Sequence, residues 1–121
     1  MQRPVNAALF AVLMLALAPR AAAAATHDGS WSVLIITEKG DCDRAYRYPL
    51  AVADGQVRYT GEAGANVSGT VTPAGAVRVS IHMGDKGASG TGHLSGSGGT
   101  GTWQGAGPSA SCSGRWEAEK R

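Results

Sequence analysis

From residue 31 to the end of the chain, apolar and polar side chains alternate in short runs. The clearest runs cover residues 31–36, 46–52 and 77–83. A period of two places every second side chain on the same face of a β-strand, whereas an amphipathic helix repeats its apolar residues every three or four positions. Turn-forming clusters separate the runs at residues 39–41, 54–55, 61–64, 73–75, 84–87, 95–98 and 105–108. The pattern therefore predicts eight short strands joined by seven turns.

Connections this short cannot make parallel crossovers, so successive strands must be antiparallel neighbours. The dipeptide Asp54-Gly55 is the strongest hairpin signal, because it suits the two positive-φ positions of a type I′ turn. A small sheet must also protect its edges, and closing it into a cylinder removes them. We therefore predict an all-β fold, a small eight-stranded antiparallel up-and-down β-barrel.

Closure of the barrel requires the last strand to lie beside the first. Cys42 follows the first predicted strand and Cys112 opens the last, and these are the two cysteines of the chain. In an antiparallel pair these two positions approach each other, so we predict a Cys42–Cys112 disulfide at the seam. The chain-entropy model for a loop of about 70 residues gives it roughly 4 kcal/mol. Two free thiols or a metal pair are the alternative, but no Cys-x-x-Cys motif or histidine cluster accompanies them.

The first 25 residues have the layout of a secretory signal peptide. Arg3 lies near the start, residues 7–18 form an apolar run, and residues 21–25 are small. The run is shorter than the ~20 residues that a membrane-spanning helix needs. We expect residues 1–25 to be cleaved, residues 26–121 to form a single β-barrel domain, and no membrane span to remain. The expected location is periplasmic or secreted, where oxidising conditions allow the disulfide.

The charge balance after cleavage argues against a nucleic-acid partner. Loss of Arg3 and Arg20 leaves nine Lys and Arg residues against nine Asp and Glu residues. Proteins that track phosphates carry a basic stripe, which this balanced sequence does not provide. We expect no nucleic-acid partner, no cofactor and a monomer that binds an unknown protein or small ligand.

The stretch GSGGTG at residues 96–101 fits the dinucleotide-binding pattern G-x-G-x-x-G. Such a loop needs an apolar strand before it, a helix after it and an acidic residue about 20 positions later, and this context is missing. Glycines alternate instead with Ser, Thr and His, which predicts strands with a bare inner face. These glycines are Gly90, Gly92, Gly99 and Gly101. A flexible linker is the alternative.

The tryptophans Trp31, Trp103 and Trp116 each follow a glycine two positions earlier. We predict that they form the barrel core, with indoles stacked on bare glycines of neighbouring strands, and a ligand platform is the alternative. The early Gly29-x-Trp31 and the late Arg115 resemble the signature of the calycins, which include lipocalins and avidins. In those families the Trp closes one barrel end and the Arg packs across it, so the resemblance implies that Arg115 belongs to the core.

Two further resemblances concern the whole plan of the chain. A small, exported, eight-stranded barrel with one disulfide resembles the secreted metalloprotease inhibitors of Gram-negative bacteria. Those inhibitors act through an N-terminal segment, here Thr26-His27-Asp28. The segments SWSVLIITEKGDC, LSGSGGTGTW and CSGRW resemble a group of small exported glycine-rich proteobacterial proteins of unknown function. Some of those proteins carry labels of haem utilisation or adhesion.

No catalytic set of side chains stands out, so we expect no enzyme. We expect a non-enzymatic exported β-barrel that binds a partner at the loops of one open end. Its candidate contacts are Tyr46, Arg47 and Tyr48, although the two tyrosines suit the core equally well. The alternatives are a periplasmic metalloprotease inhibitor and a protein that binds haem or a metal. The second alternative would use His82 and His93, whose equal parity predicts that they are adjacent on the outer face.

Overall fold

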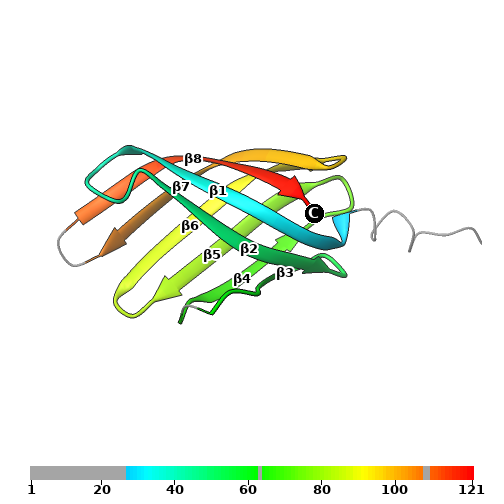
Figure 1. Cartoon of the computed structure of the whole chain (residues 1–121), viewed down its shortest axis with the longest axis horizontal. Coiled ribbons are helices and arrows are strands. Elements are labelled where there is room, and N and C mark those ends of the chain that lie inside the picture. The colour runs from blue at the N-terminus through cyan, green and yellow to red at the C-terminus, as the bar shows by residue number, and fades with distance from the viewer. Residues whose placement is uncertain (1–26, 63, 108–109) are drawn as a thin grey trace, which may run out of the picture.

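The computed structural model describes residues 27–62, 64–107 and 110–121, which form a closed barrel of eight antiparallel strands (Figure 1). The strands are β1 (Gly29–Lys39), β2 (Ala45–Ala53), β3 (Gln56–Tyr59), β4 (Asn66–Val71), β5 (Ala76–Met83), β6 (Lys86–Ser95), β7 (Gly98–Gly107) and β8 (Ala110–Lys120). Each strand pairs with its neighbours in sequence, and β1 also pairs with β8. The all-β, up-and-down barrel prediction is confirmed. The predicted signal peptide, residues 1–25, lies outside the described residues.

The predicted turns fall where the strands reverse. Asp54 and Gly55 join β2 to β3 with φ values of 52° and 75°. Both residues of a type I′ turn need positive φ, so this hairpin has the backbone that its Asp-Gly sequence favours. Within the part of the chain that the structure describes, no helix is long or apolar enough to cross a membrane.

The seam between β1 and β8 carries the predicted disulfide. Cys42 lies just after β1, Cys112 lies near the start of β8, and their Cα atoms are 6.2 Å apart in the bonded pair. The backbone N–H of Cys42 also donates to Cys112 Sγ at 3.2 Å. Bonding at this position ties the first strand to the last, which confirms the prediction made from closure.

The bare inner face of β6 and β7 receives an indole, as predicted. A Cβ atom added at Gly92 or Gly101 would overlap the ring of Trp116. The Nε1–H of Trp116 donates to the carbonyl oxygen of Thr91 on the same wall at 3.2 Å. The GSGGTG stretch forms the two-residue turn after β6 and the first four residues of β7. The glycines therefore admit a ring from β8, and the flexible-linker alternative is wrong.

The two ends of the barrel differ. At the end where β1 begins, the core is tightly buried, and its members are Trp31, Val33, Val52, Val57, Val71, Leu94, Trp116 and Ala118. His27 is itself 5% exposed at this end: it accepts the Trp31 Nε1–H at its carbonyl oxygen, 2.9 Å away, and its ring Nε2 lies 3.2 Å from the Pro73 carbonyl oxygen. We call this the closed end. At the opposite end, on the left in Figure 1, the inward-facing side chains are more exposed, including Tyr46 at 41% and Met83 at 36%. We call it the mouth.

Candidate functional site

The interior of the barrel contains an apolar cavity of about 150 Å³ that is partly open to solvent. Its lining comes from every strand and consists mostly of aliphatic side chains together with the three indoles. The lining residues are Trp31, Val33, Ile35, Tyr48, Leu50, Val52, Val57, Val67, Val71, Val77, Val79, Ile81, Ala88, Ser89, Gly90, Leu94, Trp103, Trp116 and Ala118. The lumen is therefore only partly filled by its own side chains.

The three indoles that line the cavity are held by hydrogen bonds to the backbone. Trp31, Trp103 and Trp116 donate their N–H groups to carbonyl oxygens of the backbone, at 2.9, 3.0 and 3.2 Å. Buried indole N–H groups need such partners, and partners in the wall hold the polar edge of each ring away from the barrel axis. On the neighbouring strand β6, Gly90, which pairs with Trp103, and Ala88 contribute almost no side-chain volume to the lumen. Apolar space remains between them.

Three tyrosines form a row at the mouth, and the middle one lines the cavity. The ring centroids of Tyr46 and Tyr48 are 6.0 Å apart, and those of Tyr48 and Tyr59 are also 6.0 Å apart in an edge-on arrangement. Tyr48 lines the cavity, whereas Tyr46 lies at the rim. We call these three residues the tyrosine row. Two of them were candidate contacts, and the structure places both at the open end.

The phenols of this row differ in their surroundings. A hydrogen bond with the carboxylate of Asp43, and then burial, raise the pKa of Tyr46 above its ordinary value of 10.0. Burial, followed by the neighbouring Tyr59, raises the pKa of Tyr48 above the same value. Asp43 itself is held in place by Thr37, whose hydroxyl donates to the Asp43 carbonyl oxygen at 2.6 Å. The rim thus places an acidic residue, held through its backbone, beside an aromatic ring.

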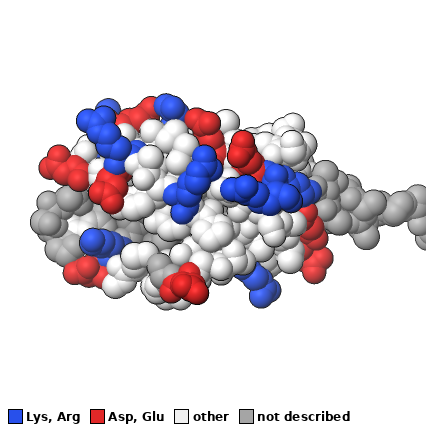
Figure 2. Space-filling model, in the orientation of Figure 1, with Lys and Arg blue, Asp and Glu red and all other residues white. Residues whose placement is uncertain are grey.

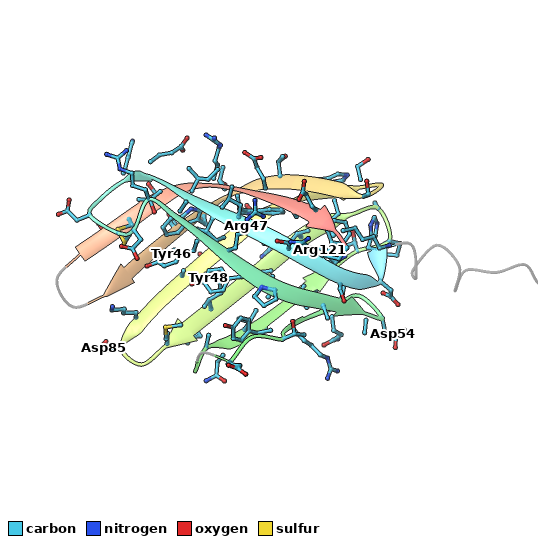
Figure 3. The ribbon with its side chains drawn as sticks, in the orientation of Figure 1. Tyr46, Arg47, Tyr48, Asp54, Asp85 and Arg121 are labelled. Atoms are coloured by element: carbon cyan, nitrogen blue, oxygen red, sulfur yellow. A yellow bond between two sulfur atoms is a disulfide. The ribbon has the colours of Figure 1, made fainter. Side chains whose placement is uncertain are left out.

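Arg47, the third candidate contact, faces away from the lumen. It lies between Tyr46 and Tyr48 on β2, so its side chain points to the outer face (Figure 3). There it donates to the hydroxyl oxygen of Ser32 at 3.2 Å. Because successive side chains of a strand point to opposite faces, Arg47 lies on the outer face and the two tyrosines on the inner face. The structure does not bring all three together.

Arg115 was expected in the core, and that expectation is wrong. Its side chain is 50% exposed, and it forms ion pairs with Glu38 at 3.3 Å and Glu117 at 3.7 Å. Arg115 directly precedes Trp116, and successive residues of a strand point to opposite faces. Because Trp116 faces the lumen, Arg115 must face solvent.

The histidine pair is also not brought together. His82 pairs with Gly87 near the mouth, whereas His93 pairs with Ala76 near the closed end. Position 76 is six residues from position 82 on β5, which corresponds to roughly 20 Å along a strand. Both histidines are exposed, as predicted, but they are not adjacent. Among the described residues, no group of three or more His, Cys, Asp or Glu side chains could hold a metal ion.

Three residues at the two ends of the barrel were not predicted as functional from the sequence. Tyr59 completes the tyrosine row, and its signal was present, since it shares a face with buried Val57 on β3. Met83 lies at the mouth on the same face as the cavity-lining Ile81. His27 was taken as part of a terminal segment, yet it is buried at the closed end.

The chain matches no protein-family model, no curated protein and no solved structure. The eight-stranded antiparallel barrel is compatible with the calycin plan to which the sequence was compared. Function has to be argued from the lumen and the mouth.

Proposed function

We propose that this protein is an exported, non-enzymatic binding protein that takes a small apolar molecule, or the apolar part of a larger one, into its lumen through the mouth. The observation that carries the proposal is the apolar cavity of about 150 Å³ inside a closed barrel. Eight-stranded barrels are just wide enough either to be filled by side chains or to hold one small ligand. This barrel has space for one small ligand.

The size and chemistry of the space define the ligand class. An apolar cavity of about 150 Å³ stays free of water and accepts a benzene-sized molecule. Water gains little in the lumen, because all three indole N–H groups already donate to backbone carbonyl oxygens. A single aromatic ring or a short aliphatic chain is the guest that fits.

The same lining argues for binding rather than catalysis. Tyr48 is the one ionisable side chain among the residues that line the cavity. General acid–base catalysis needs a group that exchanges protons near the working pH, and the raised pKa of Tyr48 moves it further from neutrality. A lumen of this kind holds its guest by burial and shape.

Toluene tests the proposal because it fills such a cavity without polar groups. Thermal unfolding is measured in buffer with and without toluene. A ligand at ten times its dissociation constant stabilises the folded state by about 1.4 kcal/mol, or roughly 5–10 °C in a domain of this size. We expect that rise in the wild-type protein, together with a change in the fluorescence of the indoles that line the cavity.

A matched pair of variants locates the bound toluene. Ala88→Leu adds three carbons to a position that lines the cavity, whereas Ala106→Leu adds the same carbons to an exposed position on the outer face of β7. The first variant should lose the toluene-dependent rise and the second should keep it. No rise in the wild-type protein, or an equal rise in both variants, would refute binding in the lumen.

A further inference from the structure

The mouth of the barrel has chemistry that the apolar lumen lacks. The tyrosine row leads from the cavity to the rim, so a guest held in the lumen presents its outer end to aromatic faces. The faces of aromatic rings carry a negative quadrupole and attract cations, and clusters of such rings recognise ammonium groups. In Figure 3, Tyr46 and Tyr48 lie along the half of β2 that approaches the mouth.

The loops around the mouth are acidic. Their described residues, 40–44, 60–62, 64–65 and 84–85, contain four carboxylates against one basic side chain. The carboxylates belong to Asp41, Asp43, Glu62 and Asp85, and the basic side chain belongs to Arg44. Charges of both signs are interspersed on the face that Figure 2 shows, so the acidic excess belongs to the loops themselves.

The strand ends next to these loops reduce the excess without reversing it. Glu38 adds one negative charge, its ion-pair partner Arg115 adds one positive charge, and Lys39 and Lys86 add two more, which leaves five acidic residues against four basic ones. Lys86 is on β6, across the barrel from β2 and β3, which carry the tyrosine row. Asp43 lies three residues before Tyr46, and its carboxylate raises the pKa of that phenol, so Asp43 is the loop carboxylate that acts on the row.

From this arrangement we infer that the guest is a small organic cation: an amine whose single ring or short chain fills the lumen and whose ammonium group lies at the rim, against the tyrosine row and beside Asp43. This inference rests on the proposed function. The ring supplies apolar contact, the tyrosine faces supply cation–π attraction, and the acidic loops draw the charged group to the mouth. A carboxylate guest of the same size would be repelled by the negative charge of the same loops.

Three probes that share one ring test the inference. They are benzylamine, benzyl alcohol and benzoate, whose polar groups are cationic, neutral and anionic at pH 7. Titration calorimetry at low and high salt gives their affinities. We expect benzylamine to bind about fivefold more tightly than benzyl alcohol, in keeping with a partly exposed cation–π contact. Benzoate should bind most weakly, and added salt should reduce the differences.

Variants separate the contributions of the rim. Tyr46→Leu keeps an apolar rim without an aromatic face and should remove most of the preference for the amine while leaving benzyl alcohol unaffected. Asp43→Asn and Asp85→Asn should each weaken benzylamine, with the larger loss at Asp43. Asp54→Asn is the matched control, because Asp54 lies in the turn between β2 and β3 at the closed end (Figure 3). Lys86→Gln should strengthen the preference.

The outcomes distinguish this inference from the function on which it rests. Binding of none of the three probes refutes both. Binding of all three with equal affinity, or tightest binding of benzoate, refutes the cationic guest and leaves the apolar lumen standing. Loss of amine preference in Asp54→Asn as large as that in Asp43→Asn would also refute it, because the charge at the mouth would then not be the cause.

Discussion

Replacing Gly101 by alanine tests the contact that shapes the barrel wall. Gly101 lies opposite Gly92 on β6 and opposite Trp116 on β8. A Cβ atom at this position would overlap the Thr91 carbonyl oxygen and the ring of Trp116, with 2.5 Å to Cζ2. Non-bonded carbon atoms prefer about 3.5–4.0 Å. The ring cannot simply move away, because its N–H donates to the same Thr91 carbonyl oxygen.

The expected loss of stability follows from these contacts. Overpacking of a well-packed site costs typically about 1–3 kcal/mol, and two rigid partners place Gly101→Ala in the upper half of that range. Alanine also has less conformational entropy than glycine in the unfolded chain, which offsets about 0.4–1 kcal/mol of this loss. The net destabilisation is about 2 kcal/mol, which lowers the midpoint of thermal unfolding by roughly 8–16 °C in a domain of fewer than 100 residues.

Urea and thermal unfolding, followed by indole fluorescence and circular dichroism, measure the effect. Gly64→Ala is the control, because an added Cβ atom there meets nothing within 4 Å. It should change the free energy of unfolding by no more than about 0.5 kcal/mol. Equal midpoints for Gly101→Ala and Gly64→Ala would refute the view that Trp116 needs a bare wall.

Three further predictions concern the seam, the surface and the mouth. Replacing Cys42 and Cys112 by serine should lower the free energy of unfolding by about 4 kcal/mol, from the 70-residue separation that the disulfide closes, and urea titration measures the loss. Arg115→Ala should cost less than about 1 kcal/mol in the same assay, because its ion pair with Glu38 joins two half-exposed side chains. The raised pKa of Tyr48 means that the unfolded chain loses this proton first as pH rises past 10.0. The contribution of Tyr48 to the free energy of unfolding is therefore complete below pH 10 and is lost above it. The free energy of unfolding should fall less between pH 9 and pH 11 in Tyr48→Phe than in the wild-type protein.

Local patterns predicted the strands, the turns and the seam because each depends on short-range chemistry. Alternation with a period of two defines a strand, and Asp54-Gly55 defines a reversal wherever it stands between two strands. The disulfide followed from one global condition, closure, applied to Cys42 and Cys112. The stacking of Trp116 on glycines followed from parity within β6 and β7.

The wrong predictions used only the alternation of side chains between the two faces of a strand. They did not take into account which residues pair across neighbouring strands or which face the adjacent residue occupies. His82 and His93 share a face, but the two-residue turn between β5 and β6 pairs position 82 with position 87, which separates them. Arg115 was assigned to the core by resemblance, although its neighbour Trp116 already occupied the inner face. The cavity could not be predicted at all, because it depends on side-chain conformation. Trp103, for example, reaches from β7 to the Ile36 carbonyl oxygen on β1, and no sequence pattern specifies that contact.

The retained cavity is itself an argument for binding. At about 24 cal/mol per Å³, an enclosed core cavity of about 150 Å³ would cost roughly 4 kcal/mol, which is the upper bound for this partly open space. That cost is comparable to the contribution expected from the disulfide. The wall beside this space is bare at Gly90, where an added Cβ atom would meet Trp116 and Trp103 at 3.5 and 3.7 Å, which are ordinary contacts, and the Thr102 carbonyl oxygen at 3.3 Å, which is tight. Unfilled apolar space beside a bare position of the wall is the arrangement expected of a protein whose interior is kept for a guest.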